Sequence, residues 1–207
     1  MNGIRHPLSL ATIAILLAAG TSHADTRGLS CGLRFHSSQL GSLERAADDV
    51  PQSVFIDETG GGGGLWLGWG FDDSFSLRLS VDGAAHETTD PAIEVGYGSV
   101  TLEALYLFRT PDHLRPFVVS GIGGFGLLSR DDQYDYGTAG GGLVTGGGLY
   151  YFFGETFALE FSGRLEFVNW EEKVASRIDD GDSQNVTTPV ESEGIAGKLT
   201  FGVSTWF

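Results

Sequence analysis

The sequence contains little cysteine, little lysine and, after residue 19, no long apolar segment, and each scarcity excludes a class of protein. Cys31 is the one cysteine among 207 residues, so no disulfide can form within the chain. Lysine occurs at two positions, 173 and 198, and the formal net charge is −15. Nucleic-acid-binding proteins neutralise phosphates with clustered Lys and Arg, so this charge balance excludes that function.

The one long apolar run lies at the N-terminus, over residues 8–19. Arg5 and His6 precede it, and the small-x-small triplet Ser22-His23-Ala24 follows it. This order is typical of a secretory signal peptide, and the run is too short to span a bilayer as a helix. We therefore expect residues 1–24 to be removed on export and residues 25–207 to form the mature domain. An uncleaved anchor is the alternative.

Helical periodicity is also scarce, and alternation of apolar and polar residues takes its place. Residues 40–50 carry apolar side chains at helical spacing, which predicts one short helix in a loop. Elsewhere every second residue is apolar, the pattern of half-buried β-strands. Eight segments show it: residues 29–36, 65–71, 75–81, 100–108, 117–127, 143–153, 157–167 and 198–207.

The connections between these segments alternate strictly between short and long. Short turns are expected at residues 72–74, 110–115 and 154–156, and long loops at residues 36–59, 83–95, 129–140 and 171–193. In an up-and-down antiparallel sheet, this alternation places all long loops at one end. The long loops hold 18 of the 27 acidic residues, so we expect an acidic surface there.

The polar face of the segments is mostly Gly, Ser and Thr with a few isolated charges. A water-exposed surface normally carries many more charges. We therefore expect the polar face to point into a narrow lumen, with its charges paired, and the apolar face to contact lipid. The predicted lumen charge network consists of Arg34, Arg78, Glu103, Glu160, Arg164, Glu166 and Lys198.

Phenylalanines flank every short turn and end the last segment. They are Phe71, Phe75, Phe108, Phe117, Phe153, Phe157 and Phe207. Aromatic side chains at one height predict a periplasmic aromatic girdle at a membrane interface. Strands of about 9–11 residues cross a bilayer, and closure leaves no unpaired edge in lipid. The fold class we predict is all-β, a closed eight-stranded antiparallel up-and-down transmembrane β-barrel.

Three stretches carry a resemblance to a known family: RPFVVSGIGGFG at residues 115–126, GGGLYYFFGETFALEFSGRLEF at residues 146–167, and the terminal LTFGVSTWF. They resemble the small outer membrane β-barrel family, the group of the eight-stranded outer membrane proteins A, X and W. The resemblance implies location in the outer membrane of a Gram-negative bacterium and contact with its lipid and lipopolysaccharide. It also implies that the barrel-assembly machinery reads Gly202 and Phe207 as a signal, although Thr205 replaces the usual aromatic or aliphatic residue.

Some barrels of this size act on lipid A, so the same residues must be considered as an enzymatic site. A deacylase of this kind uses a His-x-Ser pair on a late strand, and no histidine follows His113 here. A palmitoyltransferase places His, Asp and Ser at the outer rim. The residues that could imitate it are His36, Ser37, Ser38, Asp82 and His86. Ordinary solvated rim residues are the simpler interpretation, and we predict neither an enzyme nor a cofactor.

A metal site is not predicted either. The acidic stretch at residues 179–182 lacks the spacing of an EF-hand loop, although loose association of divalent cations there is an alternative.

Gly121, Gly123 and Gly126 match the dinucleotide-binding spacing G-x-G-x-x-G, but a polar segment rather than a helix follows them. We interpret them as strand glycines that permit curvature and leave space in the lumen. The function we predict is structural or surface-interacting, through the acidic extracellular loops and an unidentified extracellular partner. The alternative is a porin-like narrow channel for water, ions or small solutes, and a lipid A-modifying enzyme is a remote alternative.

Overall fold

The computed structural model describes residues 25–40, 56–88, 94–110, 113–130, 134–177 and 185–207. The predicted signal peptide, the acidic stretch at residues 179–182 and nearly all of the predicted helix lie outside these residues. Leu40, the first residue of that helix, instead ends a strand. Among the described residues, no helix is long and apolar enough to cross a membrane.

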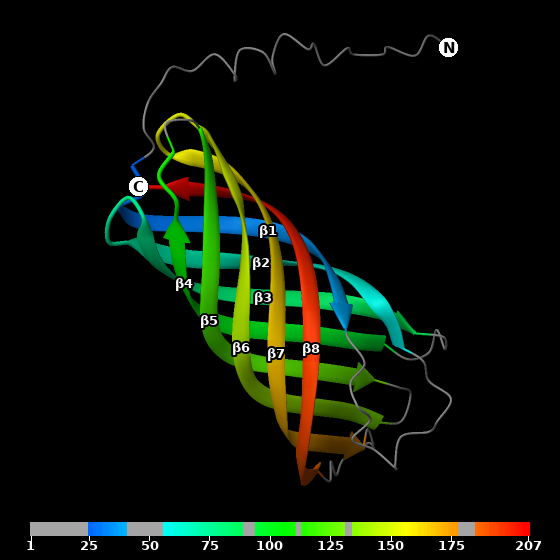
Figure 1. The fold of residues 1–207 in the computed structure, drawn as a ribbon. Coiled ribbons are helices and arrows are strands. Elements are labelled where there is room, and N and C mark those ends of the chain that lie inside the picture. The colour runs from blue at the N-terminus through cyan, green and yellow to red at the C-terminus, as the bar shows by residue number, and fades with distance from the viewer. Residues whose placement is uncertain (1–24, 41–55, 89–93, 111–112, 131–133, 178–184) are drawn as a thin grey trace, which may run out of the picture.

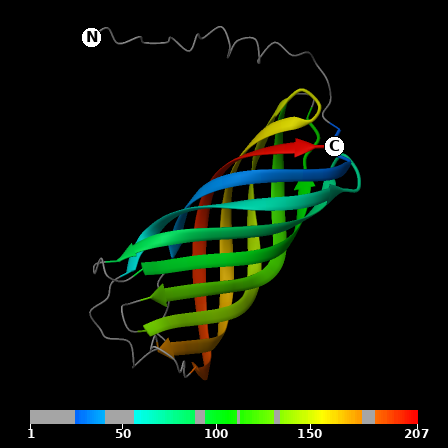
Figure 2. The same cartoon turned by 180° about the vertical axis from the view of Figure 1, so that it is seen from behind.

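Eight antiparallel strands close into a barrel in sequence order, and β8 pairs with β1 (Figures 1 and 2). This confirms the predicted fold class. The strands are β1 (Gly28–Leu40), β2 (Ile56–Gly70), β3 (Phe75–Thr88), β4 (Glu94–Leu107), β5 (Leu114–Arg130), β6 (Tyr134–Phe153), β7 (Phe157–Arg177) and β8 (Asn185–Trp206). We call the end with the β2–β3, β4–β5 and β6–β7 connections the short-turn end, and the opposite end the loop end.

Buried and exposed side chains alternate along each strand, but the buried ones are mostly polar and the exposed ones mostly apolar, the opposite of a soluble barrel. On β1, Arg34 and His36 are buried, whereas Leu33 and Phe35 between them are 58% and 72% exposed. Polar side chains therefore point into the barrel, and apolar side chains form its outer surface. This is the arrangement of a barrel that faces lipid.

The strands extend farther towards the loop end than the apolar pattern predicts. β6, β7 and β8 contain 20, 21 and 22 residues, so much of the predicted loops at residues 129–140 and 171–193 is strand. The same holds for parts of residues 36–59 and 83–95. Backbone pairing needs no apolar side chains, so strands can continue beyond the alternating region that indicates lipid contact.

Asp72 organises the turn between β2 and β3. Its Oδ1 accepts hydrogen bonds from the backbone N–H groups of Ser74, at 2.7 Å, and Phe75, at 2.9 Å. Because both bonds favour the charged carboxylate, they hold the pKa of Asp72 below its ordinary value. This local hydrogen bonding explains why a connection of four residues, 71–74, suffices here.

The glycines of β5 allow two strands to approach on the concave side of the sheet. A Cβ at Gly121 would lie 2.3 Å from the carbonyl oxygen of Leu102, and one at Gly123 would lie 2.4 Å from that of Val100. The predicted role in curvature therefore has a direct structural reason. The prediction that these two glycines leave free space is wrong, because the neighbouring backbone occupies it.

Candidate functional site

A cluster of ion pairs occupies the middle of the lumen. Arg78 and Glu103 are cross-strand partners on β3 and β4, and Arg78 Nε lies 2.5 Å from Glu103 Oε2. Arg164 on β7 reaches the same carboxylate, with Nη1 2.7 Å from Oε1. The hydroxyl of Thr101 donates to that oxygen at 2.7 Å. Glu103 is thus held by two guanidinium groups from different sides of the barrel.

Tyr150 connects this cluster to a second carboxylate. Its hydroxyl donates to Glu160 Oε2 at 3.0 Å and accepts from Arg78 Nη1 at 3.1 Å. Ser162 donates to Glu160 Oε1 at 3.0 Å, and Arg78 Nη1 lies 3.6 Å from Glu160 Oε2. The hydrogen bonds therefore cross the lumen from β3 to β6 and β7.

Lys198 of β8 forms a separate ion pair with Glu166 of β7, at 2.8 Å. The ammonium group also donates to Ser99 Oγ at 3.2 Å and lies 5.2 Å from the centre of the Tyr97 ring. The Tyr97 hydroxyl donates to Glu166 Oε2 at 2.8 Å. Both oxygens of the Glu166 carboxylate are therefore engaged.

Arg34 pairs with Asp82 through two hydrogen bonds, Nε to Oδ1 at 2.6 Å and Nη2 to Oδ2. Asp82, predicted only as a candidate rim residue, continues the inward-facing series of Arg78 and Ser80 on β3. That parity is the sequence signal that identifies it as a lumen residue. The seven residues predicted for the lumen network are all placed inside the barrel, each 0–4% exposed.

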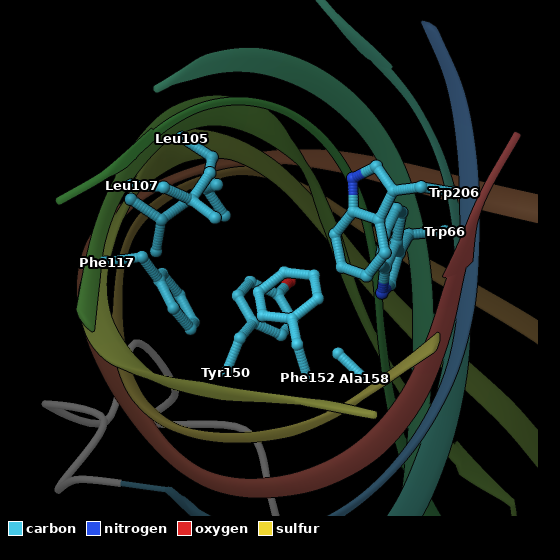
Figure 3. Packing of buried hydrophobic residues seen from close by; sticks show 9 residues of the cluster. Trp66, Leu105, Leu107, Phe117, Tyr150, Phe152, Ala158 and Trp206 are labelled. Atoms are coloured by element: carbon cyan, nitrogen blue, oxygen red, sulfur yellow. The ribbon is translucent and has the colours of Figure 1, made fainter. Parts of the chain in front are cut away.

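An aromatic and aliphatic cluster lies inside the barrel at the short-turn end, and Figure 3 shows its side chains pointing inward from the wall. We call it the short-turn cluster; it contains Trp66, Leu105, Leu107, Phe117, Val119, Tyr150, Phe152, Ala158 and Trp206. Ring centres lie 4.8 Å apart for Phe117 and Tyr150 and 5.1 Å apart for Phe152 and Trp206. These residues come from six of the eight strands, so the cluster extends across the barrel.

A second apolar cluster lies towards the loop end. It contains Leu40, Tyr97, Phe125, Val168, Trp170 and Ala196. The rings of Tyr97 and Phe125 stack with centres 6.4 Å apart. Sequence reasoning missed both clusters. The available signal was the apolar residues among the polar positions, such as Leu105 and Leu107 following Glu103 at every second residue.

The predicted aromatic girdle is only partly correct. Phe117 is a wrong assignment: it is 2% exposed and belongs to the short-turn cluster. On β5, Leu114, Pro116 and Val118 occupy the outer face, whereas Phe117 and Val119 point inward. The other six side chains lie on the outside of the barrel: Phe71, Phe75, Phe108, Phe153, Phe157 and Phe207. Tyr106 and Tyr151 join them, next to Phe108 and Phe153.

The two residues predicted as an assembly signal point to opposite sides of the barrel wall, Gly202 from β8 and Phe207 from the residue after it. Phe207 points outward, and its N–H donates to the Leu29 carbonyl at 2.9 Å, which closes the barrel at this end. Gly202 points inward, where a Cβ would lie 2.7 Å from the Leu33 carbonyl oxygen. Their recognition by an assembly factor stays a prediction.

The candidate enzymatic residues do not form a nucleophile–base pair among the described residues. His36, Ser38 and His86 point inward, Ser37 points outward, and Asp82 is occupied by Arg34. The Ser38 hydroxyl makes no hydrogen bond within the described part of the chain. The histidines are also buried rather than solvated, which corrects the prediction, because β1 and β3 extend to include them. Over the described ranges, no group of three His, Cys, Asp or Glu side chains is arranged to hold a metal ion.

Comparisons with known proteins agree with this architecture. Residues 8–188 match the family model of the outer membrane protein beta-barrel domain. Neisserial surface protein A (NspA) has a similar solved structure, with 14% identity, coverage of 87% of this chain and 97% of that chain, and a TM-score of 0.64.

Two further crystal structures are similar. For a major outer membrane protein from Thermus thermophilus, identity is 14%, coverage 86% and 99%, and the TM-score 0.57. For OprG from Pseudomonas aeruginosa, identity is 13%, the match covers 87% of this chain and 97% of that chain, and the TM-score is 0.53. A search of curated proteins gives no match. With its matched barrel domain and its outward apolar face, the chain belongs to the outer membrane protein beta-barrel family and is a protein of the outer membrane.

Proposed function

We propose that this protein is a closed barrel that acts as a structural anchor and displays its acidic loop end outside the cell. The short turns and the N-terminus face the periplasm in this proposal. Outer membrane lipid and lipopolysaccharide surround the barrel, and the assembly machinery inserts it. The observation that supports a closed barrel is the series of buried ion pairs between two apolar clusters.

A path that conducts ions through the lumen would have to break the buried ion pairs and separate the side chains of the two apolar clusters. Removing one partner from a buried ion pair costs about 3–5 kcal/mol, because the remaining charge is left uncompensated. The short-turn cluster adds apolar side chains from six strands inside the barrel. We therefore propose that the resting state excludes ions.

The acidic side chains of the loop end support the proposed role in display outside the cell. Its described exposed side chains include Glu87, Glu171, Glu172 and Glu193. Fixed negative charge at the end of a rigid barrel attracts a basic partner and repels the phosphates of neighbouring lipopolysaccharide. A basic protein surface outside the cell is the class of partner that fits.

Conductance in planar bilayers tests the closed state. We expect the natural protein to give no steady single-channel events, and the double variant Phe152→Ala, Trp206→Ala to give them, because it removes two rings from the short-turn cluster. The matched control is Phe71→Ala, which removes a ring from the outer surface. Steady conductance of the natural protein would contradict the proposal.

A register-preserving deletion tests the surface role. Glu172 on β7 pairs with Pro189 on β8, so removing residues 172–189 shortens both strands at matched positions. We expect folding to persist and the adhesion of cells displaying the barrel to a polylysine surface to fall. Unchanged adhesion would show that the acidic loop end is not the binding surface.

The second candidate function is a narrow channel for water, ions or small solutes. One observation favours it: several buried polar groups towards the loop end have no hydrogen-bond partner among the described residues. The short-turn cluster would have to move to complete such a channel. The same conductance experiment distinguishes the two functions.

A further inference from the structure

Two hydroxyl-bearing side chains face outward in the middle of the barrel wall. Ser120 on β5 and Thr145 on β6 are cross-strand partners, and both are exposed on the outer face. On β5, Ser120 lies between the outward Val118 and Ile122, which are 48% and 61% exposed. On β6, the next outward position towards the loop end is Leu143, which is 58% exposed. Because apolar side chains flank them, the two hydroxyls lie within the band that contacts acyl chains.

These hydroxyls have unused hydrogen-bonding capacity. A hydroxyl in hydrocarbon costs free energy unless it is hydrogen-bonded. Thr145 Oγ1 donates to the Val119 carbonyl at 3.4 Å, which is long for an O–H···O bond. The Ser120 hydroxyl makes no side-chain hydrogen bond within the described ranges. Both oxygens also keep lone pairs for an incoming donor, on a surface that bulk water does not reach.

Two glycines remove the side chains next to this pair. Gly147 and Gly163 are cross-strand partners on β6 and β7, and Gly147 is the outward position that follows Thr145. Gly147 has an internal reason to be glycine, because an added Cβ would lie 2.9 Å from the Phe117 carbonyl oxygen. β5, β6 and β7 run side by side in the wall (Figures 1 and 2), so the two hydroxyls and the two glycines form one area. We call these four residues the β5–β7 patch.

Gly163 has no such internal reason among the described residues. An added Cβ there would lie 3.8 Å from Leu199 Cδ2, which is an ordinary contact. Its outward neighbours on β7 are Phe161 and Leu165, which are 58% and 46% exposed. A glycine inside a strand weakens the strand and often marks a place where another backbone approaches closely. The barrel therefore accepts two costs in one area, lipid-facing hydroxyls and a strand glycine, that its own packing does not require.

The chemistry of the β5–β7 patch fits a second copy of this chain. Small residues let membrane-spanning segments approach each other, and Ser and Thr form hydrogen bonds across such contacts. An acyl chain offers no hydrogen bond, so lipid leaves both hydroxyls unsatisfied. A contact about a two-fold axis requires a surface that complements itself. Hydroxyls meet this requirement because each both donates and accepts, whereas a patch of like charges would repel its own copy.

We propose that two copies of this chain associate in the membrane through the β5–β7 patch. The hydroxyls of Ser120 and Thr145 form hydrogen bonds with those of the second copy. The exposed apolar side chains that flank the patch pack over Gly147 and Gly163. This contact lies on the wall of the barrel, so it depends neither on the closed lumen nor on the acidic loop end.

Oxidative cross-linking in outer membranes tests the location of the contact, and the natural sequence supplies a control. Cys31, the one cysteine, faces outward on β1, opposite β5 in the closed strand order. In a Cys31→Ser background, we expect Ser120→Cys or Thr145→Cys to form a disulfide-linked dimer. Its yield should exceed that of the natural protein at least about tenfold, because the sulfur atoms must come within bonding distance. An equal yield from the natural protein, or no dimer from either variant, would contradict the proposal.

Energy transfer in vesicles measures the affinity. Donor and acceptor dyes are attached at Glu155→Cys, in an exposed turn, again with Cys31→Ser. The vesicles hold this chain alone, in about 0.15 M salt, where a Debye length of about 8 Å limits repulsion between the acidic loop ends. We expect energy transfer that falls as added lipid dilutes the protein. Absence of transfer would show that a lipid or a different membrane protein covers the patch, and would overturn the proposal.

Matched variants in the same assay test the residues. Gly163→Leu places a side chain in the contact and should weaken association at least about tenfold. Ser120→Ala combined with Thr145→Ala should weaken it about fivefold, the equivalent of one hydrogen bond. The control is Gly83→Leu on β3, where the position is also outward and an added Cβ meets nothing within 4 Å. It should associate like the natural protein.

Heat-modifiable gel migration verifies the fold of each variant. Should Gly163→Leu not fold, the combined Ser120→Ala and Thr145→Ala variant decides, since it only removes polar groups from a lipid-facing surface. Association of that variant as tight as that of the natural protein would count against the hydroxyl contact. Energy transfer is read independently of conductance and adhesion, so the contact and the proposed function fail separately.

Discussion

At the residue scale, a single carboxylate shows why buried charge inside this barrel is interdependent. Glu103 is fully buried and accepts from Arg78 and Arg164, which come from opposite parts of the wall. Removing it leaves two guanidinium groups without their common partner. An exposed glutamate such as Glu155 has no comparable role, because water replaces its contacts.

We expect Glu103→Gln to lower the free energy of unfolding by about 3–5 kcal/mol, since it leaves buried positive charge uncompensated. Urea unfolding of the barrel in lipid vesicles measures this. Glu155→Gln, the control in an exposed turn, should change it by less than about 0.5 kcal/mol. Equal stability of Glu103→Gln and the natural protein would show that the ion-pair cluster is solvated.

At the element scale, the glycines on the two faces of β5 have different surroundings. Inward Gly121 and Gly123 lie against the backbone of β4, whereas a Cβ at outward Gly124 would meet nothing within 4 Å. The same residue type therefore serves close strand packing on one face. On the outer face, no neighbouring atom requires the residue to be glycine.

Alanine substitutions should separate these roles. Gly121→Ala and Gly123→Ala force β4 and β5 apart, and we expect each to destabilise the barrel by about 1–3 kcal/mol, the cost of overpacking. Gly124→Ala should stay within about 0.5 kcal/mol of the natural protein. Urea midpoints of the three variants test this, and equal effects on both faces would argue against the close approach of the strands.

At the scale of the whole molecule, closure depends on the pairing of the first strand with the last. β8 pairs with β1 from Trp206 to Ala196, and the Phe207 N–H adds a bond to Leu29 beyond the last strand residue. Closure removes the unpaired edges that lipid does not tolerate. The terminal residue therefore bears on the assembly of the complete barrel.

Deleting Phe207 should reduce the folded fraction in the outer membrane, because both the closing hydrogen bond and an interfacial ring are lost. The folded and unfolded forms separate on gels run with and without boiling. Removing the side chain alone, with Phe207→Ala, keeps the backbone bond and should give an intermediate yield. Full yield of the deletion variant would show that neither contribution limits assembly.

The sequence by itself determined the features that depend on local alternation. Eight amphipathic segments, the charged inward positions and most of the outward phenylalanines follow from a side-chain period of two, which acts within each strand. The same rule explains the errors. On β5, apolar residues occupy both faces around Phe117, with Val118 outward and Val119 inward, so the apolar pattern there is ambiguous and assigns Phe117 to the wrong face.

The tertiary structure decided everything that depends on which strands meet across the barrel. The pairing of Glu103 with Arg164, the two clusters inside the barrel, and the neighbouring hydroxyls of Ser120 and Thr145 all depend on register and closure. Alternation specifies a face but not the height at which two faces oppose each other. That height is set by the hydrogen-bonded stagger of all eight strands together.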